Sequence, residues 1–218
     1  SLCVDPSTRR PADAEPRLSL GDGTALAPFL NLSAFAEQML VHENACVAIS
    51  KEMPLDRAAL LGCAVITGAG SVFNDSRVRP GESVAVIGAG GIGLAAINAA
   101  KIAGAGMILA IDPVAEKREL ALKLGATHAL DAMADGLAKD EAVGRPNTAE
   151  LAWNILRRGG TATILGMIAP GQSVSLSGPT FLTGKKIQGS LLGSTRFPID
   201  MPRLVQMYLD GLLDLDTM

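Results

Sequence analysis

Six residues near the middle of the chain, Gly88-Ala89-Gly90-Gly91-Ile92-Gly93, have the composition and spacing of a turn that can hold a phosphate group. Glycines permit a tight turn, let backbone N–H groups approach an anion closely and let the following helix lie against the preceding strand. The first turn of a helix adds unpaired N–H groups and the positive end of the helix dipole. The segment therefore predicts a pyrophosphate site, to which Gly88, Gly90, Gly91, Ile92 and Gly93 contribute.

Asp112 is the second residue with a chemical role here, because it follows an apolar run about 20 residues beyond the turn. Its carboxylate could accept hydrogen bonds from the adenosine ribose hydroxyls, and it could also cap a helix that begins at Pro113. A 2′-phosphate about 4 Å from the carboxylate would be repelled by roughly 4 kcal/mol per unit charge, so the sequence favours NAD over NADP. Lys117 could reach a phosphate, whereas Arg118 is expected on a solvated helix face.

Three regular elements must hold the turn and the acid in place. The sequence predicts a strand at Ser83–Ile87, a helix at about residues 92–102 and a second strand at Met107–Ile111. A glycine-rich turn is weak support alone, but between an apolar strand and an apolar helix it is the dinucleotide-binding fingerprint. The unit therefore predicts that the chain binds a dinucleotide.

Helices and strands alternate along the rest of the chain. Helices are expected at residues 68–76, 114–124, 148–156 and 199–210, and strands at 127–130, 161–165 and 186–190. This alternation predicts an α/β fold with a doubly wound parallel sheet of the Rossmann type. One stretch does not fit, because the fold needs a helix and a buried strand between Leu130 and Thr148, and the sequence has no apolar strand run there.

The first 66 residues have a different character. Loop-like sequence rich in proline and aspartate comes first, and short β-like runs follow at residues 34–41 and 45–49. We expect residues 1–66 to be part of a β-rich domain. A nucleotide-binding domain at 67–192 and a return toward the first domain at 193–218 would follow.

The composition limits the kinds of binding partner and the cellular compartment to be expected. The chain has 218 residues, 48% of them hydrophobic, a formal charge of −3 and no basic run, which argues against nucleic acid and anionic membrane partners. We expect no apolar run long enough to cross a bilayer and no secretory signal at the start of the sequence. Three cysteines do not make a disulfide framework. We therefore expect a cytoplasmic protein.

Several motifs together resemble the zinc-dependent alcohol dehydrogenases of the medium-chain dehydrogenase/reductase family. Beside the glycine turn and Asp112 with Lys117, they are Leu2-Cys3, Glu43-Asn44-Ala45, Leu61-Gly62-Cys63 with Thr67-Gly68, Leu124-Gly125-Ala126-Thr127 and Glu141-Ala142-Val143-Gly144. The likeness covers essentially the whole chain, and the Leu-Gly-Cys segment is specific to the zinc branch of the family. It implies a Rossmann domain and, in the first 66 residues, a remnant of the family's GroES-like catalytic domain.

The resemblance also implies roles for individual residues. Cys63 matches a ligand of the catalytic zinc, and Cys3 matches the last of four cysteines that hold a structural zinc. Thr67 falls where the family packs the nicotinamide ring. The remaining cofactor positions are the nicotinamide loop at Val143, Gly144 and Arg145, the strand end at Leu165, Gly166 and Met167, and Leu191 at the return toward the catalytic domain.

The function implied by the resemblance is hydride transfer between NAD and a primary alcohol or aldehyde, assisted by zinc, with Cys63 and Thr67 in the catalytic site. A thiol-adduct formaldehyde dehydrogenase of the same branch stays open, as does a non-catalytic NAD-binding module. Cys63 argues against a zinc-free reductase. The implied partners are a small-molecule substrate and further copies of the chain, in a homodimer or homotetramer formed through the edge strand at 186–190.

The chain lacks much of what members of that family carry. Another zinc-binding cysteine, a Gly-His-Glu zinc motif, a Ser or Thr proton donor and three structural-zinc cysteines have no counterpart. We expect a chain truncated at both ends, with an internal gap near Asp140 and Glu141. A catalytic zinc needs three protein ligands, so with Cys63 alone this chain is not expected to hold one.

Overall fold

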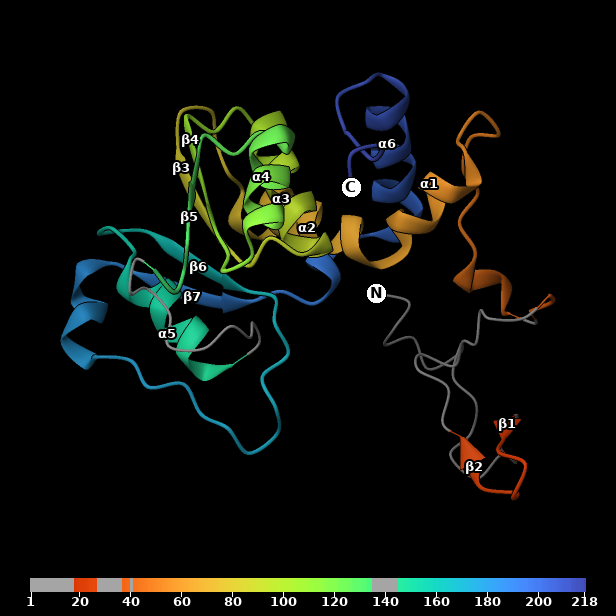
Figure 1. The fold of residues 1–218 in the computed structure, drawn as a ribbon, viewed down its shortest axis with the longest axis horizontal. Helices are drawn as coiled ribbons and strands as arrows, with labels where there is room; N and C mark the ends of the chain where they lie inside the picture. Colours follow the sequence, from red (N-terminus) through yellow and green to blue (C-terminus); the bar gives the residue numbers. More distant parts are fainter. Residues whose placement is uncertain (1–17, 27–36, 40, 135–144) are drawn as a thin grey trace.

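Parallel strands joined by helices form the middle of the chain in the computed structural model, which describes residues 18–26, 37–39, 41–134 and 145–218 (Figure 1). The first sheet has the order β3-β4-β5, with β3 at Ser83–Ile87, β4 at Met107–Ile111 and β5 at His128–Leu130. All neighbours in it are parallel. The register pairs Ser83 with Met107 and Ile87 with Ile111, so β3 and β4 end together.

Helices cover one face of this sheet. They are α2 (Ile66–Gly70), α3 (Gly91–Ile102) and α4 (Ala115–Leu124), which lie on the same side of the strands in Figure 1. Ile97, Ile108 and Leu124 are fully buried among them and belong to one core with the half-buried valines of β3. The apolar run of α3 explains its burial on nearly every side.

A second parallel pair lies beside the first sheet. It consists of β6 (Thr161–Ile164) and β7 (Lys186–Gly189), and α5 (Pro146–Asn154) packs against it. Trp153 of α5 is fully buried, and its indole N–H donates to Thr180 Oγ1 at 2.9 Å. Strands alternating with helices in parallel sheets confirm the α/β, Rossmann-like prediction. In the described residues, however, the strands form two separate sheets and not one.

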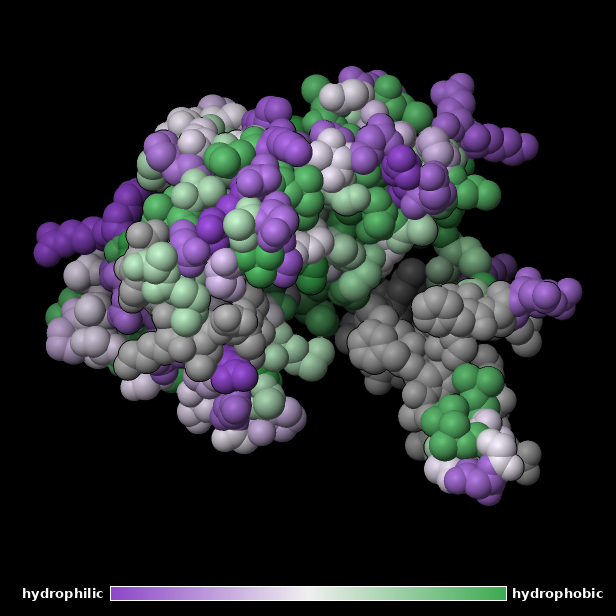
Figure 2. Space-filling view, in the orientation of Figure 1, coloured by the Kyte–Doolittle hydropathy of each residue, from purple (hydrophilic) through white to green (hydrophobic). Residues whose placement is uncertain are grey.

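One long helical segment, Leu55–Ser76, crosses the core. It joins α1 (Leu55–Leu60), α2 and two π-helical stretches, η5 (Leu61–Val65) and η6 (Ser71–Ser76). By length and composition it could span a membrane, contrary to the expectation that no apolar run is long enough. Half of its most apolar stretch is buried inside the protein, and Ile66 and Ala69 are completely inaccessible. These features are those of a core helix, and apolar and polar side chains are interspersed over the face shown in Figure 2.

The N-terminal region contains little regular structure among its described residues. A short antiparallel pair, β1 (Leu18–Ser19) and β2 (Ala25–Leu26), and the 3-10 turn η4 (Glu43–Ala45) are its elements. The strand expected at residues 45–49 is wrong, because residues 46–50 form no ladder. An apolar run becomes a strand only where a neighbouring strand pairs with it. Most of the other expected run, 34–41, lies outside the described residues.

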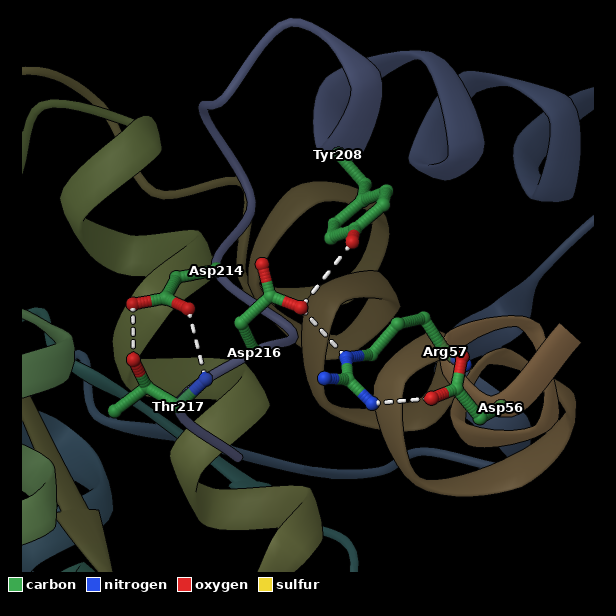
Figure 3. A network of polar contacts seen from close by, with 6 residues as sticks. All are labelled: Asp56, Arg57, Tyr208, Asp214, Asp216 and Thr217. Carbon is green, nitrogen blue, oxygen red and sulfur yellow. Dashed lines mark hydrogen bonds and ion pairs between the residues drawn. The ribbon is translucent and has the colours of Figure 1, made fainter. Parts of the chain in front are cut away.

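The C-terminal segment returns to the long helical segment. After the two 3-10 helices η7 (Gly178–Thr183) and η8 (Leu192–Ser194), α6 (Phe197–Leu209) leads to a final loop. In that loop Asp216 Oδ1 accepts a hydrogen bond from Arg57 Nε at 2.6 Å and another from Tyr208 Oη at 3.2 Å (Figure 3). These contacts fasten the end of the chain to α1 and α6.

The crossing of α2 and α3 predicts that one glycine cannot be replaced. A Cβ at Gly68 would lie 2.8 Å from Ala95 Cβ and press on the Ile92 carbonyl, whereas a Cβ at Gly62 would meet nothing within 4 Å. Gly68→Ala should lower the free energy of unfolding by about 1–3 kcal/mol. Gly62→Ala should leave it unchanged or raise it by up to about 1 kcal/mol. Urea unfolding measures both, and equal effects would contradict this packing.

The contacts of Asp216 predict an acid-dependent contribution to stability. The hydrogen bond from Arg57 is the main reason that the pKa of Asp216 lies below its usual value. Because the pKa of Asp216 is lower in the folded protein, its ionised carboxylate stabilises the fold at any pH above the unfolded-state pKa, which is near 3.9. This contribution is lost as the pH falls through the pKa of Asp216 in the folded protein. Asp216→Asn should therefore lower Tm at pH 7, with the difference from wild type shrinking below pH 4.

The matched control for this measurement is Glu119→Gln, an exposed carboxylate in the middle of α4 with no hydrogen bond or ion pair in the described structure. It should leave Tm unchanged at both pH values. A difference between Asp216→Asn and wild type that persists undiminished at pH 2.5 would show that the charge of Asp216 is not what stabilises the loop.

Candidate dinucleotide-binding site

A crevice of about 1110 Å³ runs along β3 and continues past the carboxyl ends of β3 and β4. The glycine turn and Asp112 lie on its wall, together with the carboxyl end of β6. In doubly wound sheets, ligands bind outside the carboxyl ends of the strands, where the strand order reverses. The crevice therefore occupies the position at which such a fold binds its ligand.

The turn exposes the start of α3 to this crevice. Gly88 has a φ of +94°, in the region that favours glycine, and its N–H donates to the Ile111 carbonyl at 2.8 Å. Gly90 is the N-cap of α3, and no side chain of the described residues caps the helix. The N–H groups of the first turn, at Gly91, Ile92 and Gly93, are thus left to bind an anion.

Two glycines of the turn are needed for different reasons. A Cβ at Gly93 would press on the Gly88 carbonyl and lie 3.4 Å from Val86 Cγ1, so glycine lets α3 pack onto β3. A Cβ at Gly90 would meet nothing within 4 Å. The packing of the protein itself therefore does not require glycine at position 90, and the space in front of it is open to a ligand.

Asp112 is held directly against the turn. Its side chain is buried, with the residue only 4% exposed, and its Oδ2 accepts a hydrogen bond from the Ala89 N–H at 2.7 Å. Its Oδ1 accepts another from the Val114 N–H at 2.9 Å. A carboxylate can accept about four hydrogen bonds, so two acceptor positions are left for a ligand's hydroxyl groups.

The interpretation of Asp112 as a helix cap is wrong. The helix α4 begins at Ala115, its N-cap is Val114, and Pro113 precedes it. The carboxylate joins the end of β4 to the turn after β3 through the Ala89 N–H, and its second hydrogen bond comes from Val114, which precedes the helix.

Two of the three basic side chains considered near the turn face the crevice. Lys117 is exposed and lines it, as does Arg145 at the start of α5. Arg118 does not lie on a solvated face, contrary to expectation. Its Nη1 donates to the carbonyls of Asp112 and Pro113, at 2.8 Å each, and pairs with Asp131 at 3.1 Å. It stabilises the loop after β4 and is not on the crevice wall.

The structure brings most of the expected cofactor residues together and leaves some apart. Those that line the crevice are Gly88, Gly90, Gly91, Ile92, Gly93, Asp112, Lys117, Arg145, Leu165 and Gly166. Thr67 is buried in α2 away from the crevice wall, and its hydroxyl has no hydrogen-bond partner in the described structure. Met167 and Leu191 are 83% and 64% exposed and do not line the crevice. Cys3, Val143 and Gly144 lie outside the described residues.

Some lining residues were missed by the sequence analysis. Pro113, Val114 and Ile168 form part of the crevice wall. Each follows the carboxyl end of a strand by two to four positions, and residues at that place are the ones that contact ligands in doubly wound folds. The same rule that identified Asp112 would have identified them.

The described residues do not make a zinc site. Cys63 lies in η5 with an exposed thiol, and no three His, Cys, Asp or Glu side chains of the described residues gather to hold a metal ion. The whole sequence contains only three cysteines and two histidines. A catalytic zinc needs three protein ligands, so the donor set present here does not fit one.

Comparison with known proteins identifies the family. A sequence model described as "Zinc-binding dehydrogenase" matches residues 91–210. Alcohol dehydrogenase B of Mycobacterium tuberculosis is 36% identical over 213 aligned positions, covering 90% of this chain and 57% of its own length. The aligned part of this chain is 90% of 218 residues, or about 196 residues. About 17 of the 213 aligned positions are therefore gaps in this chain. The S-(hydroxymethyl)glutathione dehydrogenase of Escherichia coli is 34% identical, with 89% and 57% covered.

A solved structure agrees with these sequences. The alcohol dehydrogenase zinc-binding domain protein of Burkholderia ambifaria superposes with a TM-score of 0.73 at 34% identity, covering 81% of this chain and 51% of that one. The chain thus spans little more than half the length of the proteins that it matches. With the family match extending over more than half of its residues, the chain belongs to the zinc-binding dehydrogenase family.

Proposed function

We propose that this chain is the nucleotide-binding part of an NAD-dependent oxidoreductase that interconverts a primary alcohol and its aldehyde. The observation that carries the proposal is the buried Asp112 carboxylate, hydrogen-bonded to Ala89 beside an uncapped helix start. The pyrophosphate would accept hydrogen bonds from the N–H groups of Gly91, Ile92 and Gly93, and Asp112 would accept those of the adenosine ribose. The name of the Mycobacterium tuberculosis relative supports the alcohol substrate.

NAD is preferred over NADP in this proposal on electrostatic grounds. A 2′-phosphate placed where Asp112 holds the ribose would lie about 4 Å from a carboxylate and be repelled by roughly 4 kcal/mol per unit charge. Arg118, one of two basic side chains that could offset this repulsion, is already bound to two carbonyls and Asp131. Lys117 is the one basic side chain of α4 on the described crevice wall.

The nicotinamide end is assigned to the residues that the family resemblance implies. We propose Thr67 beside the nicotinamide ring, Arg145 with Val143 and Gly144 in the loop next to it, and Leu165, Gly166, Met167 and Leu191 around the carboxamide. The support is that Arg145, Leu165 and Gly166 share the crevice with the glycine turn. The buried Thr67 hydroxyl, which lacks a partner in the described structure, is a donor that a ligand could use after a small shift of α2.

The zinc-dependent half of the reaction belongs to the longer protein in this proposal. Zinc, where bound, would polarise the alcohol oxygen and stabilise the alkoxide, with Cys63 as one ligand and Cys3 as a ligand of a structural zinc. The remaining ligands would come from a catalytic domain of which residues 1–66 are a part. Residues 67–192 would form the nucleotide domain, and 193–218 would lead back to the catalytic domain.

We further propose a cytoplasmic homodimer or homotetramer that associates through β7. This strand pairs only with β6 in the described part of the chain, so its outer edge is free. Phe181 and Leu182 beside it are 48% and 93% exposed. A free edge with exposed apolar neighbours is typical of a strand that pairs across a subunit interface.

A thiol-adduct formaldehyde dehydrogenase is the second candidate. The 34% identical Escherichia coli relative is named for an S-(hydroxymethyl)glutathione substrate. The two candidates differ in a simple assay of the longer enzyme, because formaldehyde oxidation would require added glutathione and oxidation of a primary alcohol would not.

The space in front of Gly90 predicts a variant that folds normally and binds NADH poorly. The Gly90→Val side chain would enter open space in the protein but occupy the position of the pyrophosphate. We expect an unchanged Tm and NADH affinity at least about tenfold weaker, a loss of about 1.4 kcal/mol or more. Titration of NADH fluorescence measures the affinity, with Gly62→Ala as control. Wild-type affinity in the Gly90 variant would contradict a pyrophosphate at this turn.

The position of Asp112 predicts cofactor preference. Asp112→Ser removes the negative charge but keeps a short acceptor for the Ala89 N–H. The variant should bind NADH more weakly, and its affinity for NADPH should rise relative to its affinity for NADH. Without the repulsion of roughly 4 kcal/mol per unit charge between the carboxylate and a 2′-phosphate, the ratio of NADPH affinity to NADH affinity should rise by about tenfold or more. Competitive titration of the two nucleotides gives the ratio. An unchanged ratio would place the ribose away from Asp112.

A further inference from the structure

Two acidic residues occupy the same place on neighbouring strands at the end of the first sheet. The register pairs Ile111 of β4 with Leu130 of β5, and the next residues along the two strands are Asp112 and Asp131. The Asp112 N–H donates to the Leu130 carbonyl at 3.2 Å, which continues the pairing up to the two acids. Neighbouring strands lie about 4.8 Å apart, so Asp131 is close to the ribose site proposed for Asp112.

Arg118 of α4 joins these two strand ends. Its Nη1 donates to the carbonyls of Asp112 and Pro113 at 2.8 Å each, and it lies 3.1 Å from Asp131 Oδ2. The terminal nitrogens of a guanidinium carry two N–H groups each, and here three oxygens share the two groups of Nη1. This nitrogen is therefore fully occupied by the protein itself.

The acidic partner of Arg118 comes from another strand and not from its own helix. The residues three or four positions away from it are all apolar, namely Val114, Ala115, Ala121 and Leu122. A basic side chain without an acidic neighbour at this spacing ordinarily extends into water. The Arg118 side chain is instead only 20% exposed. The carboxylate of Asp131 is thus the charge that holds the guanidinium against the loop after β4.

Asp131 is itself oriented for this contact. Its Oδ1 accepts hydrogen bonds from the Met133 N–H at 2.9 Å and the Ala134 N–H at 3.2 Å, while its Oδ2 faces Arg118. The N–H groups of Ala134 and Met133 also hold the pKa of Asp131 below its usual value. The carboxylate is therefore ionised at neutral pH, and its negative charge is fixed in one place.

The crevice wall shows where the guanidinium is kept. Asp112, Pro113 and Lys117 belong to the wall, whereas Arg118 and Asp131 do not. Arg118 contacts the backbone carbonyls of the loop, while the Asp112 carboxylate contacts the turn after β3. The loop that would hold the ribose thus has a positive charge next to it that does not line the crevice.

We propose that Arg118 and Asp131 set the nucleotide selectivity of this site. Asp131 holds the Arg118 guanidinium on the carbonyls of Asp112 and Pro113, which positions Asp112 for the ribose of NAD and withholds the guanidinium from a 2′-phosphate. Arginine is the side chain that accommodates the 2′-phosphate of NADP in this type of fold, through strong charge-assisted hydrogen bonds. This positioning role rests on the proposed dinucleotide function and adds to the repulsion by Asp112.

Asp131→Asn tests the proposal. The amide oxygen can still accept hydrogen bonds from Met133 and Ala134, but the amide nitrogen then places a donor against Arg118. Once released, Arg118 should reach a 2′-phosphate, and the ratio of NADPH affinity to NADH affinity should rise about threefold to tenfold. Competitive titration of the two nucleotides with the 218-residue protein gives the ratio. Asp131→Ser, which keeps a short acceptor without the charge, takes its place if Asp131→Asn does not fold.

The rise in the ratio should depend on Arg118. Arg118→Met keeps an apolar stem without the guanidinium, and in this background Asp131→Asn should leave the ratio unchanged, as a double-mutant cycle would show. Lys117 is present in every variant, so its attraction for a phosphate cancels. Asp200→Asn is the matched control, because Asp200 pairs with Arg203 at 3.4 Å and is not on the crevice wall. It should not change the ratio.

A purely structural role for the pair would weaken the binding of both nucleotides equally. An unchanged ratio in Asp131→Asn, beside normal NADH binding by the wild type, would therefore overturn this inference alone. So would a rise of the same size in the Arg118→Met background, because the charge of Asp131 itself would then be the cause. Absence of NADH binding by the wild-type protein would overturn the proposed function, and the selectivity role with it.

Discussion

The hydrogen bond from the Ala89 N–H to the buried Asp112 carboxylate is the interaction on which the rest of the site depends. It joins the turn after β3 to the end of β4, and the Gly88 N–H, which donates to the Ile111 carbonyl, reinforces the same junction. With the turn fixed in this way, the first N–H groups of α3 point into the crevice and the acid lies beside them. The uncapped start of α3 and the open space at Gly90 then leave room for a diphosphate.

Most of the fold could be predicted from local patterns in the sequence. The strands at Ser83–Ile87 and Met107–Ile111, the helix after the glycine turn and the later helices appear within one or two residues of their expected positions. Their apolar periodicity is a property of the segment itself. The contact of Asp112 with the turn also followed, because strand, turn, helix and strand together allow little other geometry.

What the sequence could not show depends on distant partners. The run at residues 45–49 has strand composition but no ladder, since no described strand lies where it could pair. Arg118 has the position of a surface residue on α4, yet two carbonyls and Asp131 draw its guanidinium inward. The division of the strands into two sheets likewise depends on contacts between distant segments. The sequence has no apolar strand run between Leu130 and Thr148, but only the coordinates show that β3 and β6 line the same crevice.

The central claim is that the amides of one turn bind a diphosphate while Asp112 holds the sugar. Amide hydrogen exchange of residues 88–93 and 112–114, with and without saturating NADH, tests it most directly. The account predicts slower exchange at Gly91, Ile92 and Gly93 on binding, together with protection around Asp112. Protection elsewhere in the protein, with these amides exchanging as fast as in the free state, would contradict it.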